Sequence, residues 1–158
     1  MSPPLAIRVR RVLGELETAD DLRLGIRILG ATLFVRVAKH VLPLHRLVAL
    51  MTPTPGGDGV RDPRREARIA RMAGWAARAV RPFGEGNCLE RSLVVYRELV
   101  RAHAMPQLHM GFKSGASGVE GHAWVVLDGR PICDSAARCA EYGVAMTFSP
   151  GRSPVRTA

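Results

Sequence analysis

Apolar residues in the first third of the chain recur at spacings of three and four, which is the period of an α-helix. This apolar stripe follows one helix face and consists of Leu22, Ile26, Leu29, Leu33 and Val37, with Phe34 and Val41 widening it. Capping side chains at residues 18–21 precede the stripe and Pro43 follows it, so a helix is expected between them. A second short helix is expected from Leu44 to Met51.

Residues 52–61 interrupt this pattern with two prolines and three glycines, which are typical of a connector. They divide the chain into a helical N-terminal part (1–51, for partner docking or for covering the core), a linker (52–61), a core (62–148) and a tail (149–158). The tail has two prolines and no apolar pattern, so it is expected to be disordered. Asp62 and Pro63 suit the first turn of a helix, which predicts another helix at the start of the core.

Beyond Pro106 the apolar period changes to two, the period of a β-strand. Leu108, Met110 and Phe112 alternate with other residues, 114–121 resemble a loop, and 122–127 are rich in β-forming residues. Asp128 and Gly129 predict a turn, after which residues 130–134 return as a strand. The predicted fold is therefore α+β, with a helix after Cys88 packed on a small antiparallel sheet.

The chain is strongly basic: 23 Lys and Arg stand against 14 Asp and Glu, which gives a formal net charge of +9. Such a surplus favours an acidic partner, nucleic acid or an anionic membrane surface, but it is equally typical of an arginine-rich proteome. The last interpretation is preferred, because no basic stretch interleaved with aromatic residues is present to stack bases. We therefore expect no nucleic-acid partner.

The apolar segment 22–50 is interrupted by charges, and its longest uncharged run, Ile28 to Val35, is far shorter than the roughly 20 residues that span a bilayer. The first residues also lack the pattern of a signal peptide. No membrane span is expected, and a cytoplasmic protein is the simplest expectation. The three cysteines, Cys88, Cys133 and Cys139, agree with this, because their odd number and spacing do not suggest a disulfide framework.

Cys88 is the cysteine whose surroundings suggest chemistry, because it stands between a glycine-rich turn and a predicted helix. A helix N-terminus stabilises negative charge and so favours the thiolate, which is the nucleophilic form. Gly84 and Gly86 allow the backbone to approach a substrate closely. The backbone N–H of Cys88 is a candidate donor to a developing oxyanion. A buried structural cysteine is the alternative.

His122 begins a predicted strand after a flexible loop, and a neutral imidazole there is a candidate base for Cys88. A third group must orient the ring, and Asp134, at the end of the returning strand, is preferred over the turn residue Asp128. A three-residue loop ending in a left-handed Gly129 would pair residues 122–126 with 130–134 and set His122 opposite Asp134. A two-residue loop would put the two side chains on opposite faces. The proposed pairing of His122 with Asp134 therefore favours the three-residue loop.

The same residues offer a metal site as an alternative, with Cys133, Cys139, His122 and Asp134 as ligands. No close C-x-x-C pair is present, and Cys133 alternates away from Asp134 on the strand, so zinc is disfavoured. Cys133 and Cys139 are expected to be packing residues. Neither a metal nor a cofactor is expected.

Three runs resemble the lasso peptide biosynthesis B2 proteins, a family of transglutaminase-like cysteine peptidases. They are Cys88-Leu89-Glu90-Arg91-Ser92-Leu93, Gly121-His122-Ala123-Trp124-Val125, and Asp128-Gly129-Arg130-Pro131 with Asp134. The resemblance covers about residues 81–134 and is only general for the N-terminal half. It implies a papain-like/transglutaminase-like core with Cys88 as nucleophile, His122 as base and Asp134 as the orienting acid.

The resemblance also implies a substrate and partners. Members of that family remove the leader from a ribosomally made precursor peptide. A separate leader-binding recognition protein (B1) holds the leader, and a macrolactam cyclase then closes the freed core peptide. The helix over residues 22–41 is a candidate docking element for the recognition protein, through a helix-in-groove or helix-pair contact.

Two alternatives remain open at the level of sequence. A transglutaminase-like acyl transfer to an amine would use the same thioester intermediate and differ only in what resolves it. A non-catalytic peptide-binding module, using the basic face of the helix after Pro63, is disfavoured by the intact Cys, His and Asp set.

Overall fold

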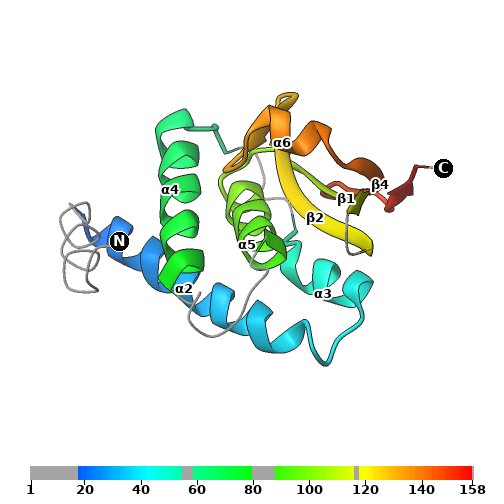
Figure 1. Cartoon of the computed structure of the whole chain (residues 1–158). Coiled ribbons are helices and arrows are strands. Elements are labelled where there is room, and N and C mark those ends of the chain that lie inside the picture. Colours follow the sequence, from blue (N-terminus) through cyan, green and yellow to red (C-terminus); the bar gives the residue numbers. More distant parts are fainter. Residues whose placement is uncertain (1–17, 55–58, 80–87, 116–117, 158) are drawn as a thin grey trace, which may run out of the picture.

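The computed structural model describes residues 18–54, 59–79, 88–115 and 118–157. The helices come first, as α2 (Ala19–Ala38), α3 (Leu44–Met51), α4 (Pro63–Ala79) and α5 (Cys88–Arg101). Strands β1 (Gln107–Gly115), β2 (Gly118–Leu127) and β3 (Arg130–Ile132) follow, then α6 (Ala136–Ala140), β4 (Gly143–Phe148) and β5 (Val155–Arg156). This order confirms the predicted α+β fold (Figure 1).

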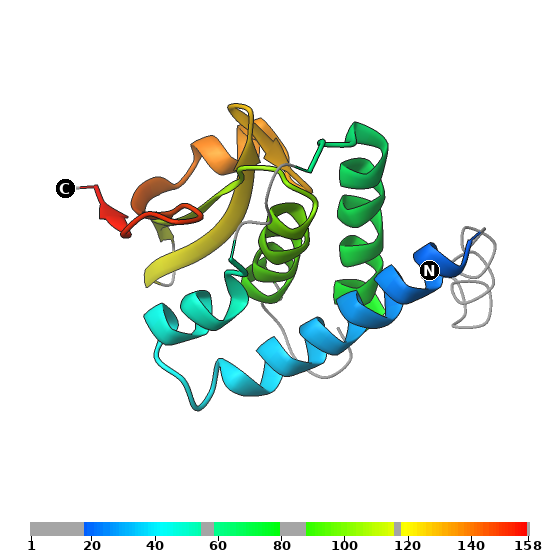
Figure 2. The same ribbon diagram turned by 180° about the vertical axis from the view of Figure 1, so that it is seen from behind.

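The strands form an antiparallel sheet in the order β3-β2-β1-β4-β5. Helix α5 lies between this sheet and helices α2 and α4, as Figures 1 and 2 show from opposite sides. Buried residues from α2, α3, α4, α5 and the three longest strands belong to one apolar cluster, so the N-terminal helices share the core of the sheet. The central helix α5 is buried most completely, with Leu93, Tyr96 and Leu99 fully enclosed.

Helix α2 begins where the sequence predicts, because Thr18 and Asp21 form a capping box. The Asp21 backbone N–H donates to Thr18 Oγ1 at 3.2 Å, and the Thr18 backbone N–H donates to Asp21 Oδ2 at 3.2 Å. The helix is apolar on two faces. Its core face carries Leu24, Ile28 and Val35, whereas the apolar stripe found in the sequence lies on the outer, exposed face.

The β2–β3 hairpin differs from the predicted register. Leu127 pairs with Arg130 and Val125 with Ile132, so the loop has two residues, Asp128 and Gly129. Both have positive φ, 51° and 76°, which is the type I′ turn that an Asp-Gly pair favours. The positive φ predicted for Gly129 is therefore confirmed. The predicted three-residue loop is wrong, because the type I′ turn matches the twist of the strands and so connects them with one loop residue fewer.

Two further segments are more regular than the sequence suggested. Residues 114–121 are mostly strand, since β1 and β2 extend toward each other on either side of residues 116–117. In the tail, expected to be disordered, Val155 and Arg156 of β5 pair with Thr147 and Met146 of β4. The disorder expected for 149–158 is therefore corrected: backbone pairing to an open sheet edge orders a segment that has no apolar pattern of its own.

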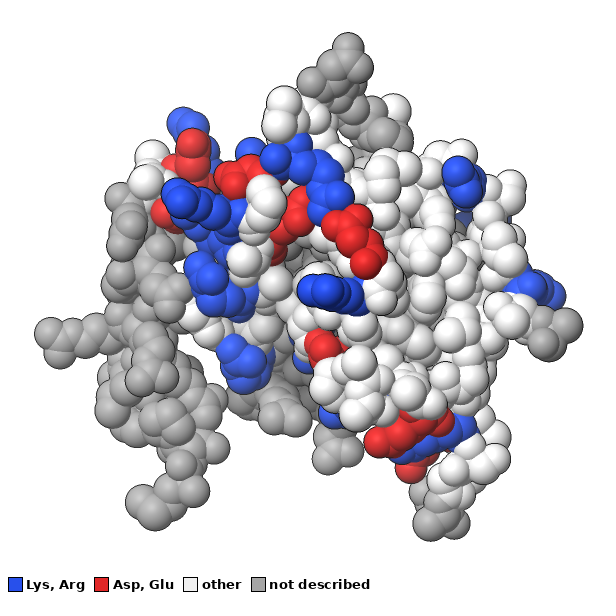
Figure 3. Space-filling model, turned by 90° about the horizontal axis from the view of Figure 1, so that it is seen from above, with Lys and Arg blue, Asp and Glu red and all other residues white. Residues whose placement is uncertain are grey.

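Positive charge is interleaved with negative charge rather than gathered in one basic patch on the face seen in Figure 3. Arg61 contacts the carboxylates of Glu66 and Asp128, each at 2.8 Å. These contacts connect the start of α4 to the β2–β3 turn. No helix among the described residues is long and apolar enough to cross a membrane.

Candidate active site

His122 and Asp134 are in direct contact in the interior. His122 Nε2 lies 2.7 Å from Asp134 Oδ2, and the two side chains are only 3% and 7% exposed. This contact confirms the expectation that Asp134, rather than Asp128, lies within hydrogen-bonding reach of the imidazole. Asp128 instead pairs with Arg61 at the hairpin turn.

The contact forms although the hairpin register would separate the two residues. Continued beyond Ile132, the observed ladder would place Asp134 opposite Ala123, facing away from His122. The chain leaves the ladder at Cys133, whose φ of 64° lies in the left-handed region. That residue interrupts the alternation of side chains and turns Asp134 toward the imidazole. The backbone N–H of Ser135 then donates to Asp134 Oδ1 at 3.1 Å and fixes the carboxylate from the other side.

Asp134 is held in its ionised form. Burial acts to raise its pKa, but the hydrogen bond from His122 and the positive charge of Arg91 outweigh burial and keep the pKa below its ordinary value. An ionised carboxylate only accepts hydrogen bonds, so Nε2 of a neutral His122 carries the proton and donates it. Nδ1 therefore keeps its lone pair, which makes Nδ1 the atom able to accept a proton from a thiol.

Arg91 and Ser92 connect helix α5 to this pair. Arg91 Nη2 donates to Asp134 Oδ2 at 3.0 Å, the same oxygen that His122 contacts. Ser92 Oγ donates to the backbone carbonyl of Ala123, the residue after His122, at 2.8 Å. The sequence motif contained both residues but gave them no role. Their position one turn after Cys88 was the available signal.

Cys88 is the first residue of α5 and is half-buried. Residues three and four positions apart share a helix face, so Cys88 lies on the same side of α5 as Arg91 and Ser92. Those two residues contact Asp134 and the strand that carries His122. The helix face of Cys88 is therefore the face that meets the His122–Asp134 pair. That Nδ1 points to the sulfur stays a prediction, and Gly84 and Gly86 lie outside the described residues.

Two aromatic rings, of Trp124 and Tyr142, enclose His122. The sequence motif contained Trp124 without giving it a role, and Tyr142 was not identified from the sequence. The Trp124 ring stacks on the imidazole with centroids 5.8 Å apart, and the Tyr142 ring lies at 4.9 Å. Tyr142 immediately precedes β4, whose apolar residues Val144, Met146 and Phe148 alternate and were a readable strand signal. The rings restrict the imidazole to one orientation and exclude water from one side of it.

The other two cysteines are packing residues, as expected. Cys133 packs against the main core and its thiol donates to the Ala70 carbonyl at 3.2 Å, while Cys139 is buried beside Trp124 and Tyr142. Burial raises the pKa of both thiols above the ordinary value, which disfavours the thiolate. Among the described residues, no group of three His, Cys, Asp or Glu side chains is arranged to hold a metal ion.

Comparison with models of known protein families finds a match. The family model described as the transglutaminase-like superfamily matches residues 29–147, which is more than half of the chain and spans the region from α2 to β4. Comparisons with curated proteins and with solved structures found no significant match. The matched region includes helix α5, the β2–β3 hairpin and Asp134. The chain belongs to the transglutaminase-like superfamily.

Proposed function

We propose that this protein is a cysteine peptidase that removes the leader peptide from a ribosomally synthesised lasso peptide precursor. The observation that carries the cysteine chemistry is the 2.7 Å contact between His122 and Asp134, beside the helix that begins at Cys88. Members of the superfamily are typically cysteine peptidases or acyltransferases, which fits this assignment. The choice of a leader peptide as substrate is supported by the motifs around Cys88, His122 and Asp134.

In the proposed reaction, His122 Nδ1 accepts the proton of Cys88 and the thiolate attacks the scissile carbonyl. The resulting oxyanion lies near the start of α5, where the Cys88 backbone N–H is a candidate donor. The intermediate expels the amine of the core peptide, which takes the proton from the imidazolium, and a thioester to Cys88 remains. Water then attacks the thioester, with Nδ1 again accepting a proton, and releases the leader with a free carboxylate.

Asp134 and Arg91 orient the base in this scheme. Asp134 fixes the imidazole with Nδ1 unprotonated and stabilises the imidazolium that forms. Arg91 donates to the Asp134 carboxylate from helix α5, which also carries Cys88. The Arg91 side chain therefore fixes the distance between α5 and Asp134. The proposed scheme requires no cofactor. We place the reaction in the cytoplasm, where precursor peptides are made.

The experiment that tests this function follows the fate of the thioester. The purified chain is incubated with the precursor and the leader-binding protein in water enriched in oxygen-18. A peptidase should release a leader with one heavy oxygen in its new carboxylate, measured by mass spectrometry. Adding a primary amine tests the alternative: transfer to the amine in preference to water would make this chain an acyltransferase. No cleavage and no transfer would contradict both activities.

We further expect efficient cleavage to require a separate leader-binding partner. No strand module for leader binding is visible in the described residues beyond the core sheet. At a low precursor concentration, adding the recognition protein should therefore raise the cleavage rate by about 10²-fold, the scale of gain that a tethered substrate provides. Initial rates with and without it, at equal precursor concentration, measure the effect. Full activity of the isolated chain would contradict the requirement.

A further inference from the structure

The outer face of α2 exposes an unusual amount of apolar surface. The large apolar side chains on this outer face are each 44–68% exposed. They are Leu22, Ile26, Leu29, Leu33, Phe34 and Val37. A helix of 20 residues is roughly 30 Å long, so this stripe extends along one side of the molecule. Isolated exposed apolar residues are ordinary, but a contiguous stripe of this length is typical of an interaction site.

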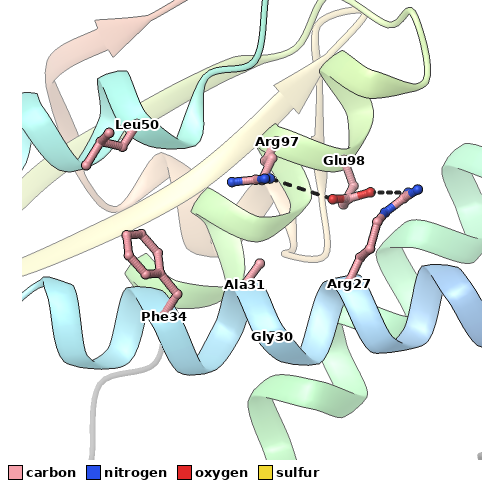
Figure 4. Close-up of a pocket in the computed structure, with 7 residues that line it drawn as sticks. All are labelled: Arg27, Gly30, Ala31, Phe34, Leu50, Arg97 and Glu98. Carbon is pink, nitrogen blue, oxygen red and sulfur yellow. Dashed lines mark hydrogen bonds and ion pairs between the residues drawn. The ribbon is translucent and has the colours of Figure 1, made fainter.

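A pocket opens at the edge of this stripe, between α2, α3 and α5 (Figure 4). Its volume is about 360 Å³. Ala31 and Phe34 of α2 and Leu50 of α3 form its apolar wall, and Arg97 and Glu98 of α5 form its polar end. Gly30 lines it without a side chain, and a Cβ added there would meet no atom within 4 Å. The pocket therefore has room for an apolar side chain that enters from outside.

The polar end of the pocket has a net positive charge, because the two guanidinium groups of Arg27 and Arg97 face the single carboxylate of Glu98. Glu98 is buried and contacts Arg27 at 2.5 Å, while Arg97 lies farther from it, at 3.9 Å. Within the described residues, the hydrogen-bond acceptor of Arg97 is the sulfur of Met51, at 3.6 Å. Burial lowers the pKa of Arg97, and the charges of Arg101 and Arg27 lower it further, against the effect of Glu98. A carboxylate from outside would relieve this crowding and give the guanidinium a better acceptor.

We propose that the stripe and this pocket, together the α2 surface, dock an acidic amphipathic segment of a partner protein. An apolar side chain of the segment enters between Phe34 and Leu50, and a neighbouring carboxylate pairs with Arg97. The rest of its apolar side covers the stripe along α2, in the manner of a helix packed against a helix. The proposal is independent of the chemistry at Cys88.

Charge and shape favour this occupant over three others. A second copy of the chain would bring its own Arg27 and Arg97 against the same residues, and like charges repel. Residues 1–17 of this chain carry three arginines against two glutamates, the wrong sign for a basic pocket. An anionic bilayer has the right sign, but a flat surface does not fill a pocket between three helices.

The test uses a fluorescein-labelled synthetic helix of about 18 residues, with leucine along one side and glutamate beside it, and a matched helix with lysine in place of glutamate. Fluorescence anisotropy against the full chain should show at least about tenfold tighter binding of the glutamate peptide. Gly30→Leu fills the pocket mouth with a better helix former, and Phe34→Ser removes its wall; each should weaken binding about tenfold or more. Arg97→Gln should abolish the preference for glutamate.

Val119→Ser provides the matched control, because Val119 is an exposed apolar residue on β2, outside the α2 surface, and its loss should leave binding unchanged. Equal binding of the two peptides, or unchanged binding by Gly30→Leu, would overturn the proposal. If the chain self-associates in analytical ultracentrifugation and Phe34→Ser removes this self-association, the α2 surface binds a second copy instead. Binding to phosphatidylglycerol vesicles without binding to the glutamate peptide would assign it to a membrane.

Discussion

Cys88→Ala is expected to abolish precursor cleavage, with a loss of at least about 10⁴-fold in turnover, because no other group can form the thioester. Cys88 stands at the start of α5, on the helix face that meets the His122–Asp134 pair. The methyl group of alanine suits a helix start, so the variant should fold and still bind the precursor. Cleavage rates by mass spectrometry, together with precursor affinity, separate the loss of chemistry from the loss of binding.

Cys133→Ala and Cys139→Ala are the matched controls. Cys139 is buried and Cys133 is half-buried against the core, and burial raises the pKa of both thiols. Their removal should therefore cost about 1–2 kcal/mol of stability and leave turnover within a factor of about two. Cys133 precedes Asp134 in the chain, which makes it the more stringent control. A loss of turnover in Cys133→Ala as large as that in Cys88→Ala would reject Cys88 as the sole nucleophile.

Asp134→Asn is expected to lower turnover by about 10²–10⁴-fold while the KM changes little. The amide removes the charge that stabilises the imidazolium and no longer enforces the tautomer with Nδ1 unprotonated. It also leaves the cation of Arg91 without its carboxylate. Steady-state kinetics measure the split between kcat and KM.

The depressed pKa of Asp134 determines the pH range over which the native enzyme has the charge that this variant lacks. A carboxylate whose folded pKa lies below the unfolded value stabilises the fold above the unfolded pKa, and the stabilisation disappears as pH falls through the folded pKa. Asp134 is thus ionised in the native enzyme throughout the range from about pH 5 to about pH 8. The native enzyme therefore has the carboxylate charge over this whole range, and Asp134→Asn should be impaired at its acidic end as well as at its basic end.

Asp128→Asn serves as the control for Asp134→Asn. Asp128 contacts Arg61 at the exposed hairpin turn, and asparagine also tolerates its left-handed conformation. Turnover should therefore be close to that of the native chain. An Asp128→Asn variant as impaired as Asp134→Asn would show that the wrong acid has been assigned to His122.

Local signals in the sequence predicted several elements well. Capping side chains were expected within residues 18–21, and Thr18 and Asp21 supply them as a capping box before α2; α3 occupies Leu44–Met51 as expected. Asp62 accepts a hydrogen bond from the Arg64 backbone N–H at 2.9 Å, at the start of α4. Each signal depends on residues within one turn of each other, where side-chain chemistry determines the local backbone.

In the β2–β3 hairpin, the contact between the site residues was predicted correctly, but the backbone path between them was not. The pairing of His122 with Asp134 was correct, but it was attributed to a three-residue loop. The structure uses a two-residue turn and then a left-handed Cys133 to reach the same contact. A non-glycine residue with positive φ is uncommon and has no signature in the sequence, so only tertiary packing determines where the chain leaves the strand.

The two faces of α2 show a different limit. Periodicity identified the stripe from Leu22 to Val37, but the core instead packs against Leu24, Ile28 and Val35. A helix that is apolar on both sides gives no pattern by which to choose the buried face. The contacts of Tyr142 with His122 and of Arg91 with Asp134 join residues far apart in the chain, which periodicity does not detect.

The central claim is that His122 activates Cys88, and the rate of Cys88 alkylation by iodoacetamide tests it without any substrate. Peptide mapping after short exposures gives the rate for each of the three cysteines in the same molecule. At about pH 6, Cys88 should react at least about tenfold faster than a free thiol, and His122→Ala should remove this advantage. Cys133 and Cys139 should react more slowly than a free thiol in both proteins. A Cys88 rate no faster than that of a free thiol, or one unchanged by His122→Ala, would contradict the claim.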